Sequence, residues 1–344
     1  MRIIQPQKQA SKAKLTIGSV ELNSISILAP MAGITDTVFR QLVRMFSKDC
    51  LLVSEMLSSE ALKMSKKQNI LDCNEIEYPL AFQISGHKPE LMAESAKKLQ
   101  DIATIIDINM GCPAPKIVRN NDGAKLMTDL KLASRIIFSI KKAVDIPVTV
   151  KCRLGWDCNS KNYLEFARMA EESGADAIIV HGRTKSQMYS GISDWEAIGE
   201  VKNAVKIPVI GNGDIDSPEK ARTCLEISKC DGIAIARGAL GDPGLIYRID
   251  NYIETGVIMP ELTVSERLDL ALIHCKRECD YRGELHGIRF MRKFFSWYIK
   301  DIRDAAKYRH SMVRVNTLAE VEELIGLIRF HPCSHREVPN KYIS

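Results

Sequence analysis

Apolar and polar positions alternate along this chain with two different periods, which predicts a repeated strand–helix unit. Eight short runs rich in Val, Ile, Leu and Ala end at turn residues, as buried parallel strands do. These runs span residues 25–30, 51–55, 80–84, 104–108, 148–152, 177–181, 209–211 and 232–236. Between them, apolar residues recur at helical spacing, for example over 89–100, 130–144, 163–173 and 218–227. Ser217 followed by Pro218 is a typical helix start.

Strands and helices that alternate in this way predict an α/β fold, and eight such units predict a TIM (β/α)8 barrel. An open doubly wound sheet is the alternative. Its usual sign, the pattern Gly-x-Gly-x-x-Gly after the first strand, does not occur in this chain.

The strand pattern ends near Thr263, and helical periodicity follows over 266–279, 288–307 and 318–328. In the middle segment, Ile288, Met291, Tyr298 and Ile302 share one face, which predicts a buried stripe. We therefore predict two domains, a catalytic barrel over residues 1–258 and an all-α helical domain over residues 259–344.

Positive charge is concentrated on the helical part. The whole chain has a net charge of +5, whereas residues 282–314 hold nine Lys and Arg against three acids. Arg289, Arg292 and Lys293 lie on the polar face of the middle helix and begin a basic ridge. Most charged helix faces are simply solvated, but one basic segment on a neutral body, next to Trp297, favours a nucleic-acid partner.

The composition is that of an ordinary soluble globular protein, 45% hydrophobic and 26% charged. Residues 1–14 are polar and basic, so we expect no signal peptide, and no apolar run approaches the roughly 18 residues of a membrane span. The ten cysteines include no Cys-x-x-Cys pair, which favours reduced thiols over a metal site. We therefore expect a cytoplasmic protein that binds neither a membrane nor a metal.

Side chains able to bind a ligand stand at or just after the end of each apolar run. In chain order they are Met31, Glu55, Gln83, Asn109, Lys151 with Arg153, His181 with Arg183, Asn212 with Asp214, and Arg237. Because the carboxyl ends of barrel strands converge on one face, we expect these residues to surround a single pocket.

Cys112 is the strongest candidate for a reactive group. The apolar run 104–108 breaks into the motif NMGCP at 109–113, where Gly and Pro produce a turn. One cysteine among ten has a low prior of being catalytic, but a turn just past a strand leaves this thiol accessible. Lys151, at the end of its own strand, would place a positive charge at the same pocket, although an exposed lysine at a strand end is common.

Glycine-rich turns after the last two strands predict a phosphate site. Gly213 follows the seventh strand, and Arg237, Gly238 and the motif GDPG at 241–244 follow the eighth, where such barrels usually bind phosphate. Ordinary turn chemistry explains either motif alone, whereas two motifs on adjacent strands favour a phosphorylated ligand.

Five motifs, in this order, resemble those of the tRNA-dihydrouridine synthases, and the bacterial B-type branch is the most similar. They are LAPMAGITD at 28–36, DINMGCP at 107–113, KCRLGW at 151–156, VHGRT at 180–184 and GNGD at 211–214. The resemblance extends from about residue 15 to about residue 315 and includes the helical tail.

The resemblance implies an FMN enzyme that uses NADPH to reduce the C5–C6 double bond of specific uridines in tRNA to 5,6-dihydrouridine. Hydride would pass from flavin N5 to uracil C6, and Cys112 would give the proton to C5. The residues that would bind FMN are Pro30, Met31, Ala32, Gln83, Lys151, His181, Asn212, Gly213, Asp214, Ala236 and Arg237.

The same resemblance implies two groups of tRNA contacts. Asn109, Arg153 and Arg183 would hold a D-loop uridine that is flipped out into the active site, and Arg289, Arg292 and Lys293 would contact the RNA from the ridge. Because one tRNA would span both domains, we expect a monomer.

Three residues depart from the family pattern: Ala236 where glycine is usual, Phe294 where histidine is usual, and Ala124 where a small hydroxyl is usual. Two other functions remain open. A dihydroorotate-type dehydrogenase of a small pyrimidine would share the phosphate loops but would give no role to the basic ridge. An RNA-binding protein without catalysis would carry no flavin.

Overall fold

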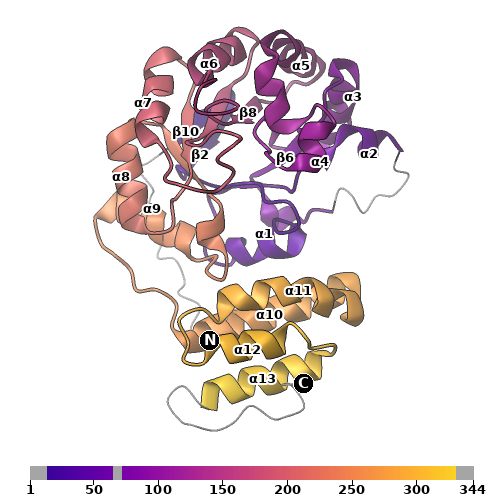
Figure 1. Cartoon of the computed structure of the whole chain (residues 1–344), viewed down its shortest axis with the longest axis vertical. Helices are drawn as coiled ribbons and strands as arrows, with labels where there is room; N and C mark the ends of the chain where they lie inside the picture. Colours follow the sequence, from indigo (N-terminus) through magenta and orange to yellow (C-terminus); the bar gives the residue numbers. More distant parts are fainter. Residues whose placement is uncertain (1–13, 65–71, 331–344) are drawn as a thin grey trace.

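The computed structural model describes residues 14–64 and 72–330 and shows a closed parallel barrel with a helical bundle beneath it (Figure 1). The barrel strands are β3 (Ser26–Leu28), β4 (Leu51–Val53), β6 (Leu80–Ser85), β7 (Ile105–Asn109), β8 (Val148–Cys152), β9 (Ala177–His181), β10 (Val209–Asn212) and β11 (Gly232–Ile235). Neighbouring strands run parallel in the order β4-β3-β11-β10-β9-β8-β7-β6, and the pairing of β4 with β6 closes the ring. The eight predicted strands and the TIM barrel are confirmed, and the alternative of an open sheet is wrong.

Helices follow the strands and cover the outside of the barrel (Figure 1). They are α1 (Thr37–Arg44), α2 (Ser59–Met64), α3 (Pro89–Leu99), α4 (Pro115–Arg119), α5 (Leu130–Ala143), α6 (Tyr163–Glu172), α7 (Trp195–Ala204), α8 (Pro218–Ser228) and α9 (Leu245–Thr255). The apolar face of each long helix is buried, as Ile136 and Ile140 of α5 are. The predicted start of α8 is confirmed, because the Ser217 side chain accepts a hydrogen bond from the Lys220 backbone N–H.

An antiparallel hairpin that the sequence analysis did not predict closes the amino-terminal end of the barrel. It consists of β1 (Leu15–Ile17) and β2 (Val20–Leu22). Leu15 and Ile17 are buried in one apolar cluster with the strand residues Ile27, Ile105 and Ile210. Another short strand, β5 (Leu57–Ser58), pairs with the end of β6. Since the hairpin fills one end of the barrel, the carboxyl-terminal end is the one that can hold a ligand.

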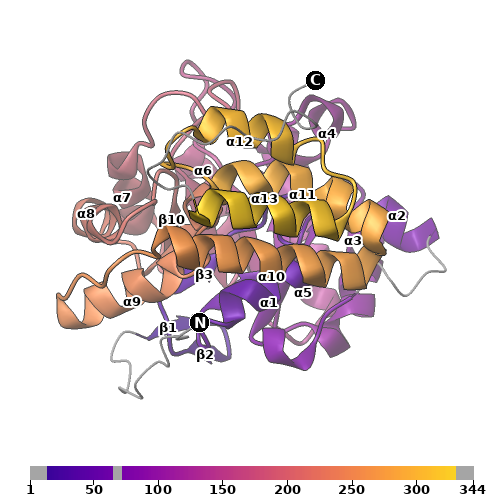
Figure 2. The same cartoon turned by 90° about the horizontal axis from the view of Figure 1, so that it is seen from below.

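The helical domain consists of α10 (Val264–Arg282), α11 (Glu284–Tyr298), α12 (Ala305–Met312) and α13 (Leu318–Phe330). Figure 2 shows these helices from below, across the face of the barrel. The prediction of one helix over 288–307 is wrong, because α11 ends at Tyr298 and α12 begins at Ala305. Asp301 and Asp304 both have a φ of 58°, in the left-handed region, which an α-helix does not accommodate.

The helical domain and the barrel share one core. The buried ring of Phe294 in α11 lies 6.1 Å, centroid to centroid, from Phe39 in α1, and 4.7 Å from His274 in α10. Ile288 and Met291 of the predicted stripe are also fully buried. Phe294, where the family usually has histidine, is therefore a core residue in this chain and is not available to RNA.

No helix in the described part of the chain is long and apolar enough to cross a membrane. Nor do the described residues include a group of three His, Cys, Asp or Glu side chains placed to hold a metal ion. The prediction for the N-terminal segment concerns residues that, apart from Lys14, lie outside the described ranges.

Candidate active site

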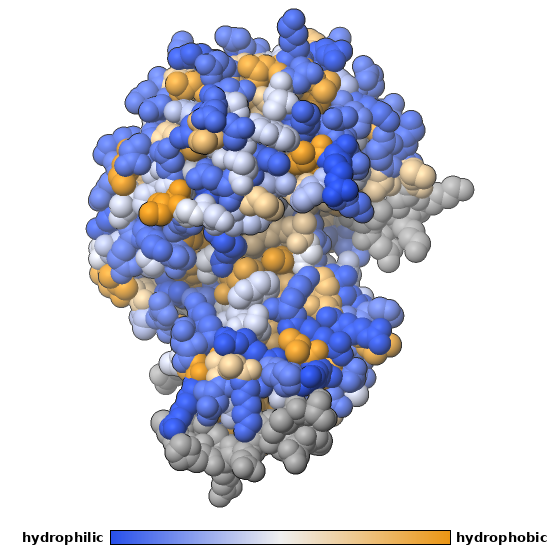
Figure 3. Space-filling view, in the orientation of Figure 1, coloured by the Kyte–Doolittle hydropathy of each residue, from blue (hydrophilic) through white to orange (hydrophobic). Residues whose placement is uncertain are grey.

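A cavity of about 800 Å³ lies at the carboxyl-terminal end of the barrel and faces the helical domain. The surface is hollowed at this place, between the barrel and the helical domain below it (Figure 3). Residues at strand ends around the barrel line the cavity, and Trp297 and Lys300 join them from the helical domain. The strand ends therefore meet at one pocket, and both domains contribute to its wall.

Most of the predicted site residues line this cavity. They are Pro30, Met31, Ala32, Gln83, Asn109, Cys112, Lys151, Arg153, His181, Asn212, Gly213, Asp214, Ala236 and Arg237. Five predicted residues, Glu55, Arg183, Arg289, Arg292 and Lys293, are not part of its lining. The Glu55 carboxylate instead accepts a hydrogen bond from the Gly33 backbone N–H.

Two hydrogen bonds to the backbone groups of Cys112 hold the turn in which it lies, one from a side chain and one from the backbone. Its N–H donates to the side-chain oxygen of Asn109 at 2.9 Å, and its carbonyl oxygen accepts from Ala124 N at 3.0 Å. Gly123 has a φ of 60°, and a Cβ added there would lie 2.7 Å from the Cys112 carbonyl oxygen. The turn therefore requires glycine at 123, whereas the residue at 124 contributes only its backbone N–H. The thiol itself is partly exposed at the cavity.

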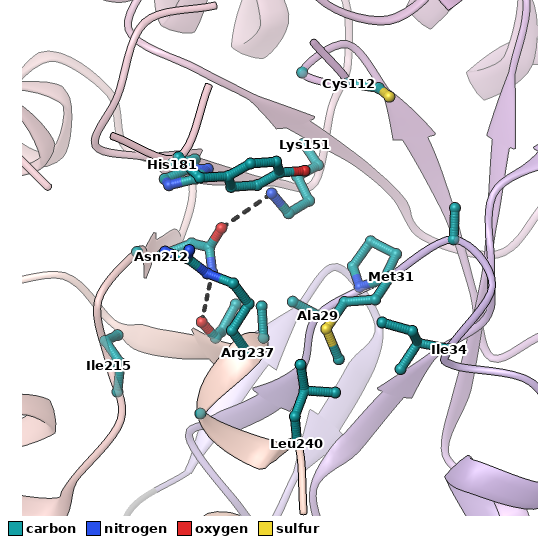
Figure 4. Close-up of a pocket in the computed structure, with 18 of the residues that line it drawn as sticks. Ala29, Met31, Ile34, Cys112, Lys151, His181, Asn212, Ile215, Arg237 and Leu240 are labelled. Atoms are coloured by element: carbon teal, nitrogen blue, oxygen red, sulfur yellow. Dashed lines mark hydrogen bonds between the residues drawn. The ribbon is translucent and has the colours of Figure 1, made fainter. Parts of the chain in front are cut away.

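Lys151 enters the same cavity from the end of β8 (Figure 4). Its ammonium donates to Asn212 Oδ1 at 3.1 Å, and Asn212 Nδ2 donates in turn to the Ala234 carbonyl at 2.6 Å. Burial, and then the charge of Arg153, lower the pKa of Lys151 to about 8. An ammonium has three N–H donors, so Lys151 can bind an anion or carbonyl in the cavity while it keeps its bond to Asn212.

His181 is neutral at physiological pH. Burial, followed by the charges of Lys151, Arg153, Arg183 and Arg237, lowers the pKa of His181 far below its usual range. Because Arg183 Nη1 can only donate, the His181 Nε2 that lies 3.2 Å from it must accept. The remaining proton is then on Nδ1, which makes His181 a neutral donor at the cavity wall.

The cavity has one apolar side and one cationic side (Figure 4). Ala29, Met31, Ile34 and Leu240 form the apolar side. Opposite them lie the positive groups of Lys151 and Arg237 and the neutral side chain of His181. The carboxylate of Asp214, 3.5 Å from Arg237, is already paired with Arg183, so this side keeps positive charge for an anion. A flat, partly apolar ligand that carries negative charge fits this arrangement.

Comparison with known proteins gives the family of this chain. Residues 27–330 match the sequence profile described as "Dihydrouridine synthase (Dus)". The chain belongs to the dihydrouridine synthase family. It is 44% identical to a probable tRNA-dihydrouridine synthase of Rickettsia bellii over 90% of this chain and 96% of that protein. It is 40% identical to tRNA-dihydrouridine synthase B of Vibrio vulnificus, over 91% and 98%. The resemblance drawn from the five motifs, B-type relatives included, is confirmed.

A solved structure supports the fold but adds nothing about function. The complex of 2-naphthoyl-CoA reductase with 2-naphthoyl-CoA aligns with a TM-score of 0.56 at 13% identity, over 71% of this chain and 52% of that one. At this identity the likeness concerns the barrel architecture alone.

The resemblance implies that Arg183 contacts the uracil, but in this dihydrouridine synthase its side chain does not line the cavity. Its guanidinium is buried and donates to both carboxylate oxygens of Asp214, at 2.8 and 2.6 Å, and to the carbonyls of Ser190 and Gly191. Asp214 lies at the cavity, so Arg183 stands behind it and fixes the loop after β10. The sequence does not show which of the two arginines expected to contact the uracil, Arg153 or Arg183, pairs with the half-buried carboxylate of Asp214.

Arg153 lines the cavity, but most of its donors are taken by the backbone. Its Nε donates to the Gly111 carbonyl at 2.8 Å, and its Nη1 donates to the carbonyls of Thr184 and Met188 at 2.9 and 2.7 Å. The face of Tyr189, which also lines the cavity, lies 5.5 Å from the guanidinium carbon. Arg153 therefore ties the Cys112 turn to the loop after β9.

The basic ridge is less free than the sequence indicates. Arg292 donates to the Val315 carbonyl and to Asn316 Oδ1, and Lys293 donates to the Gly33 carbonyl of the barrel. Arg289 is exposed. The motif at 241–244 also has a structural role, since a Cβ on Gly241 would lie 2.5 Å from the Trp297 carbonyl oxygen.

Sequence reasoning missed two contributions to the site. Trp297, which the sequence places beside the basic ridge, lines the cavity together with Lys300, because α11 ends over the barrel mouth. Asp107 lies within the apolar run 104–108, but its carboxylate accepts a hydrogen bond from Gln83 Nε2 at 2.7 Å. A charged residue inside an apolar run was the available signal.

Proposed function

We propose that this enzyme reduces the C5–C6 double bond of specific uridines in tRNA to 5,6-dihydrouridine, with FMN in the cavity and NADPH as the reductant. One observation carries the proposal: the accessible thiol of Cys112 and the ammonium of Lys151 line the same cavity at the mouth of a barrel from this family. The helical domain also lines this cavity, so a substrate much larger than a nucleotide could contact both the barrel and the helical domain.

The residues present fit FMN. The apolar side of the cavity, with Met31 and Ala29, suits one face of an isoalloxazine ring. Lys151 would lie at the edge of the ring that carries negative charge, and Gln83 would hydrogen-bond its pyrimidine portion. Arg237 and the loops after β10 and β11 would bind the phosphate, as is usual for such barrels. When bound, FMN supplies the hydride that uracil C6 receives.

Cys112 would complete the reduction as a general acid. Addition of hydride at C6 leaves negative charge shared by C5 and O4, so C5 must take up a proton. The Cys112 S–H bond breaks, the proton joins C5, and the thiolate is reprotonated from solvent. The hydrogen bonds that the backbone of residue 112 makes to Asn109 and Ala124 would hold the thiol in place for this transfer.

The uridine would be extruded from the RNA stack to enter the cavity, at a cost of a few kcal/mol. Asn109 and Arg153 line the wall beside Cys112 and are the proposed uracil contacts. Trp297 and Lys300 would contact the same nucleotide from the helical domain. Arg289, and Arg292 held by Val315, would bind phosphates further away. We further propose a monomer that acts on tRNA in the cytoplasm.

The experiment that tests the proposal maps dihydrouridine in tRNA. A host strain that lacks its own dihydrouridine synthases would receive either this chain or Cys112→Ala. We expect dihydrouridine at one or more D-loop positions with the unmodified chain and none with the variant. Purified protein should be yellow with flavin. Protein that binds tRNA but carries no flavin and forms no dihydrouridine would favour the RNA-binding alternative.

The charge of Lys300 separates this activity from the other one considered above, a dehydrogenase of a small pyrimidine. Lys300 is exposed and lines the cavity from the helical domain. Lys300→Glu should weaken reduction of tRNA, because the reversed charge repels phosphate. An enzyme for a free pyrimidine would not turn over tRNA, either unmodified or as Lys300→Glu, and the variant would keep its activity on the small substrate.

A further inference from the structure

One layer inside the barrel is polar. Gln83 on β6, Asp107 on β7 and Thr149 on β8 are register partners on adjacent strands, and all three are buried. The interior of a TIM barrel is normally filled by branched apolar side chains. A buried carboxylate is unfavourable unless it is well hydrogen-bonded, so Asp107 requires an explanation.

Asp107 begins a series of hydrogen bonds that ends at the Cys112 turn. Thr149 Oγ1 donates to Asp107 Oδ1 at 2.6 Å, and Gln83 Nε2 donates to Asp107 Oδ2 at 2.7 Å. Asn109 Nδ2 donates to Gln83 Oε1 at 2.8 Å. The Asn109 oxygen then accepts from Cys112 N at 2.9 Å and from Gly111 N at 3.3 Å.

The direction of this series follows from the carboxylate. An ionised carboxylate only accepts hydrogen bonds, so the Gln83 amide must turn its nitrogen toward Asp107 and its oxygen toward Asn109. The Asn109 amide must then turn its nitrogen toward Gln83, which leaves its oxygen for the backbone N–H of Cys112. If either amide were reversed, two N–H donors or two oxygen acceptors would face each other in a buried space and could not form a hydrogen bond.

The charge of Asp107 is consistent with this role. Burial raises the pKa of Asp107 to about 6, although the hydrogen bonds from Thr149 and Gln83 and the charge of Lys151 oppose the shift. The carboxyl group is therefore mostly ionised at neutral pH. Asp107 does not line the large cavity, so it acts on the site through Gln83 and Asn109.

We infer that Asp107 is a positioning residue whose carboxylate orients the amides of Gln83 and Asn109 and thereby holds the Cys112 turn at the active site. The catalytic part of this inference rests on the proposed function, but the order of the turn can be measured without turnover. The competing explanation is that Asp107 acts only through its negative charge, which would stabilise the ammonium of Lys151.

The test compares two substitutions in the full-length protein. Asp107→Val removes the acceptor for Gln83. Asp107→Asn removes the charge but keeps the direction, because its Oδ1 can accept from Gln83 while its Nδ2 donates to Thr149 Oγ1. If Asp107→Val does not fold, Asp107→Ala removes the same acceptor with less steric demand.

The first readout is the rate at which iodoacetamide alkylates Cys112, followed by peptide mass spectrometry. Exposed Cys158 serves as the internal control in every sample. We expect Asp107→Val to raise the rate at Cys112 by about threefold or more, because the released turn exposes the thiol, and to leave the rate at Cys158 unchanged. Asp107→Asn should stay within about twofold of the unmodified protein.

The second readout is steady-state reduction of tRNA. We expect Asp107→Val to lower kcat by about tenfold or more while KM for tRNA changes by less than about twofold, and Asp107→Asn to keep most of kcat. Equal losses in both variants would overturn the inference in favour of charge. Normal alkylation at Cys112 in a folded Asp107→Val protein would also overturn it. The alkylation result is unaffected if the proposed activity proves wrong, so the two failures can be distinguished.

Discussion

The ammonium of Lys293, in α11, donates a hydrogen bond to the carbonyl oxygen of Gly33, which lies 260 positions earlier in the loop after β3. The N–H of the same glycine donates to the carboxylate of Glu55, in the segment after β4. Gly33 has a φ of 73°, and a Cβ there would approach the Lys293 nitrogen to 3.3 Å. Since Met31 of this loop lines the cavity, the helical domain supports the wall against which the cofactor would lie.

Lys293 should therefore affect FMN binding, and not only tRNA binding. We expect Lys293→Met to raise the Kd for FMN by about fivefold, because the variant loses one charge-assisted hydrogen bond worth roughly 1 kcal/mol. Flavin fluorescence during titration of flavin-free protein measures this. Arg289→Met, on the same helix and exposed, is the matched control: it should weaken tRNA binding and leave FMN binding unchanged. Equal FMN affinity in both variants would show that Lys293 does not support FMN binding and contributes only to tRNA binding.

Loss of the thiol should abolish the chemistry and spare the binding. Cys112→Ala should lower the rate of dihydrouridine formation by about 100-fold or more, in the range expected for removal of a general acid. Bound flavin and tRNA affinity should remain near those of the unmodified protein, because the hydrogen bonds that hold the turn use the backbone of residue 112 and not its side chain. Cys158→Ala, at an exposed cysteine, should change none of these quantities. A Cys112→Ala enzyme with an undiminished rate would remove this residue from its role.

The ionisation of Lys151 should make FMN binding depend on pH. Its pKa in the folded protein is about 8, against an ordinary 10.5, so the ammonium is lost as the pH rises through about 8. We expect FMN affinity of the flavin-free protein to fall between about pH 7.5 and 9.5. Lys151→Arg stays charged and should flatten this profile. A decline of the same size in the Arg variant would assign the titration to another group.

The lowered pKa of Lys151 also affects the free energy of unfolding, which should rise with pH where FMN affinity falls. The folded state binds this proton less tightly than the unfolded state, in which the pKa is near 10.5. Between about pH 8 and 10.5 the unfolded state carries more protons at this position, so Lys151 contributes stability that increases as pH rises through this interval. Chemical denaturation of Lys151→Met, compared with the unmodified protein over the same interval, isolates this contribution from the other titrating groups.

Gly123 should be intolerant of any side chain. Gly123→Ala adds a Cβ that would lie 2.7 Å from the Cys112 carbonyl oxygen at a φ of 60°, so both strain and collision act on the catalytic turn. We expect a loss of about 2–3 kcal/mol in the free energy of unfolding, and lower activity in the folded fraction. Gly256→Ala is the matched control, because Gly256 has a φ of 72° and a ψ of 1°, and the nearest atom to the added Cβ, Arg222 Nη2, lies 3.9 Å away. It should lose only about 1–2 kcal/mol and keep its activity.

The sequence predicted the barrel because each of its strands is an apolar run bounded by turn residues, as in β7 and β8. It could not predict the hairpin of β1 and β2, whose strands are three residues long and too short to show a period. The break between α11 and α12 was hidden because Ile302 continues the apolar stripe of α11, while the left-handed backbone at Asp301 and Asp304 leaves no mark in that pattern.

The site was predicted to the extent that strand ends determine it. Cys112, Lys151 and Asn212 lie at or just after the ends of apolar runs, so the topology of the barrel alone brings them together. The roles of Arg183 and Lys293 depend on which acceptor each cation finds in three dimensions, Asp214 in one case and Gly33 in the other. Local sequence carries no information about such long-range partners.

The contact between Phe39 of α1 and Phe294 of α11 has a consequence for how the protein unfolds. Because both rings belong to one continuous apolar interior, heating should melt barrel and bundle together in a single calorimetric transition. The bundle is therefore not a detachable module. A chimera that grafts it onto a different barrel would need to carry along the surface of α1 on which it rests.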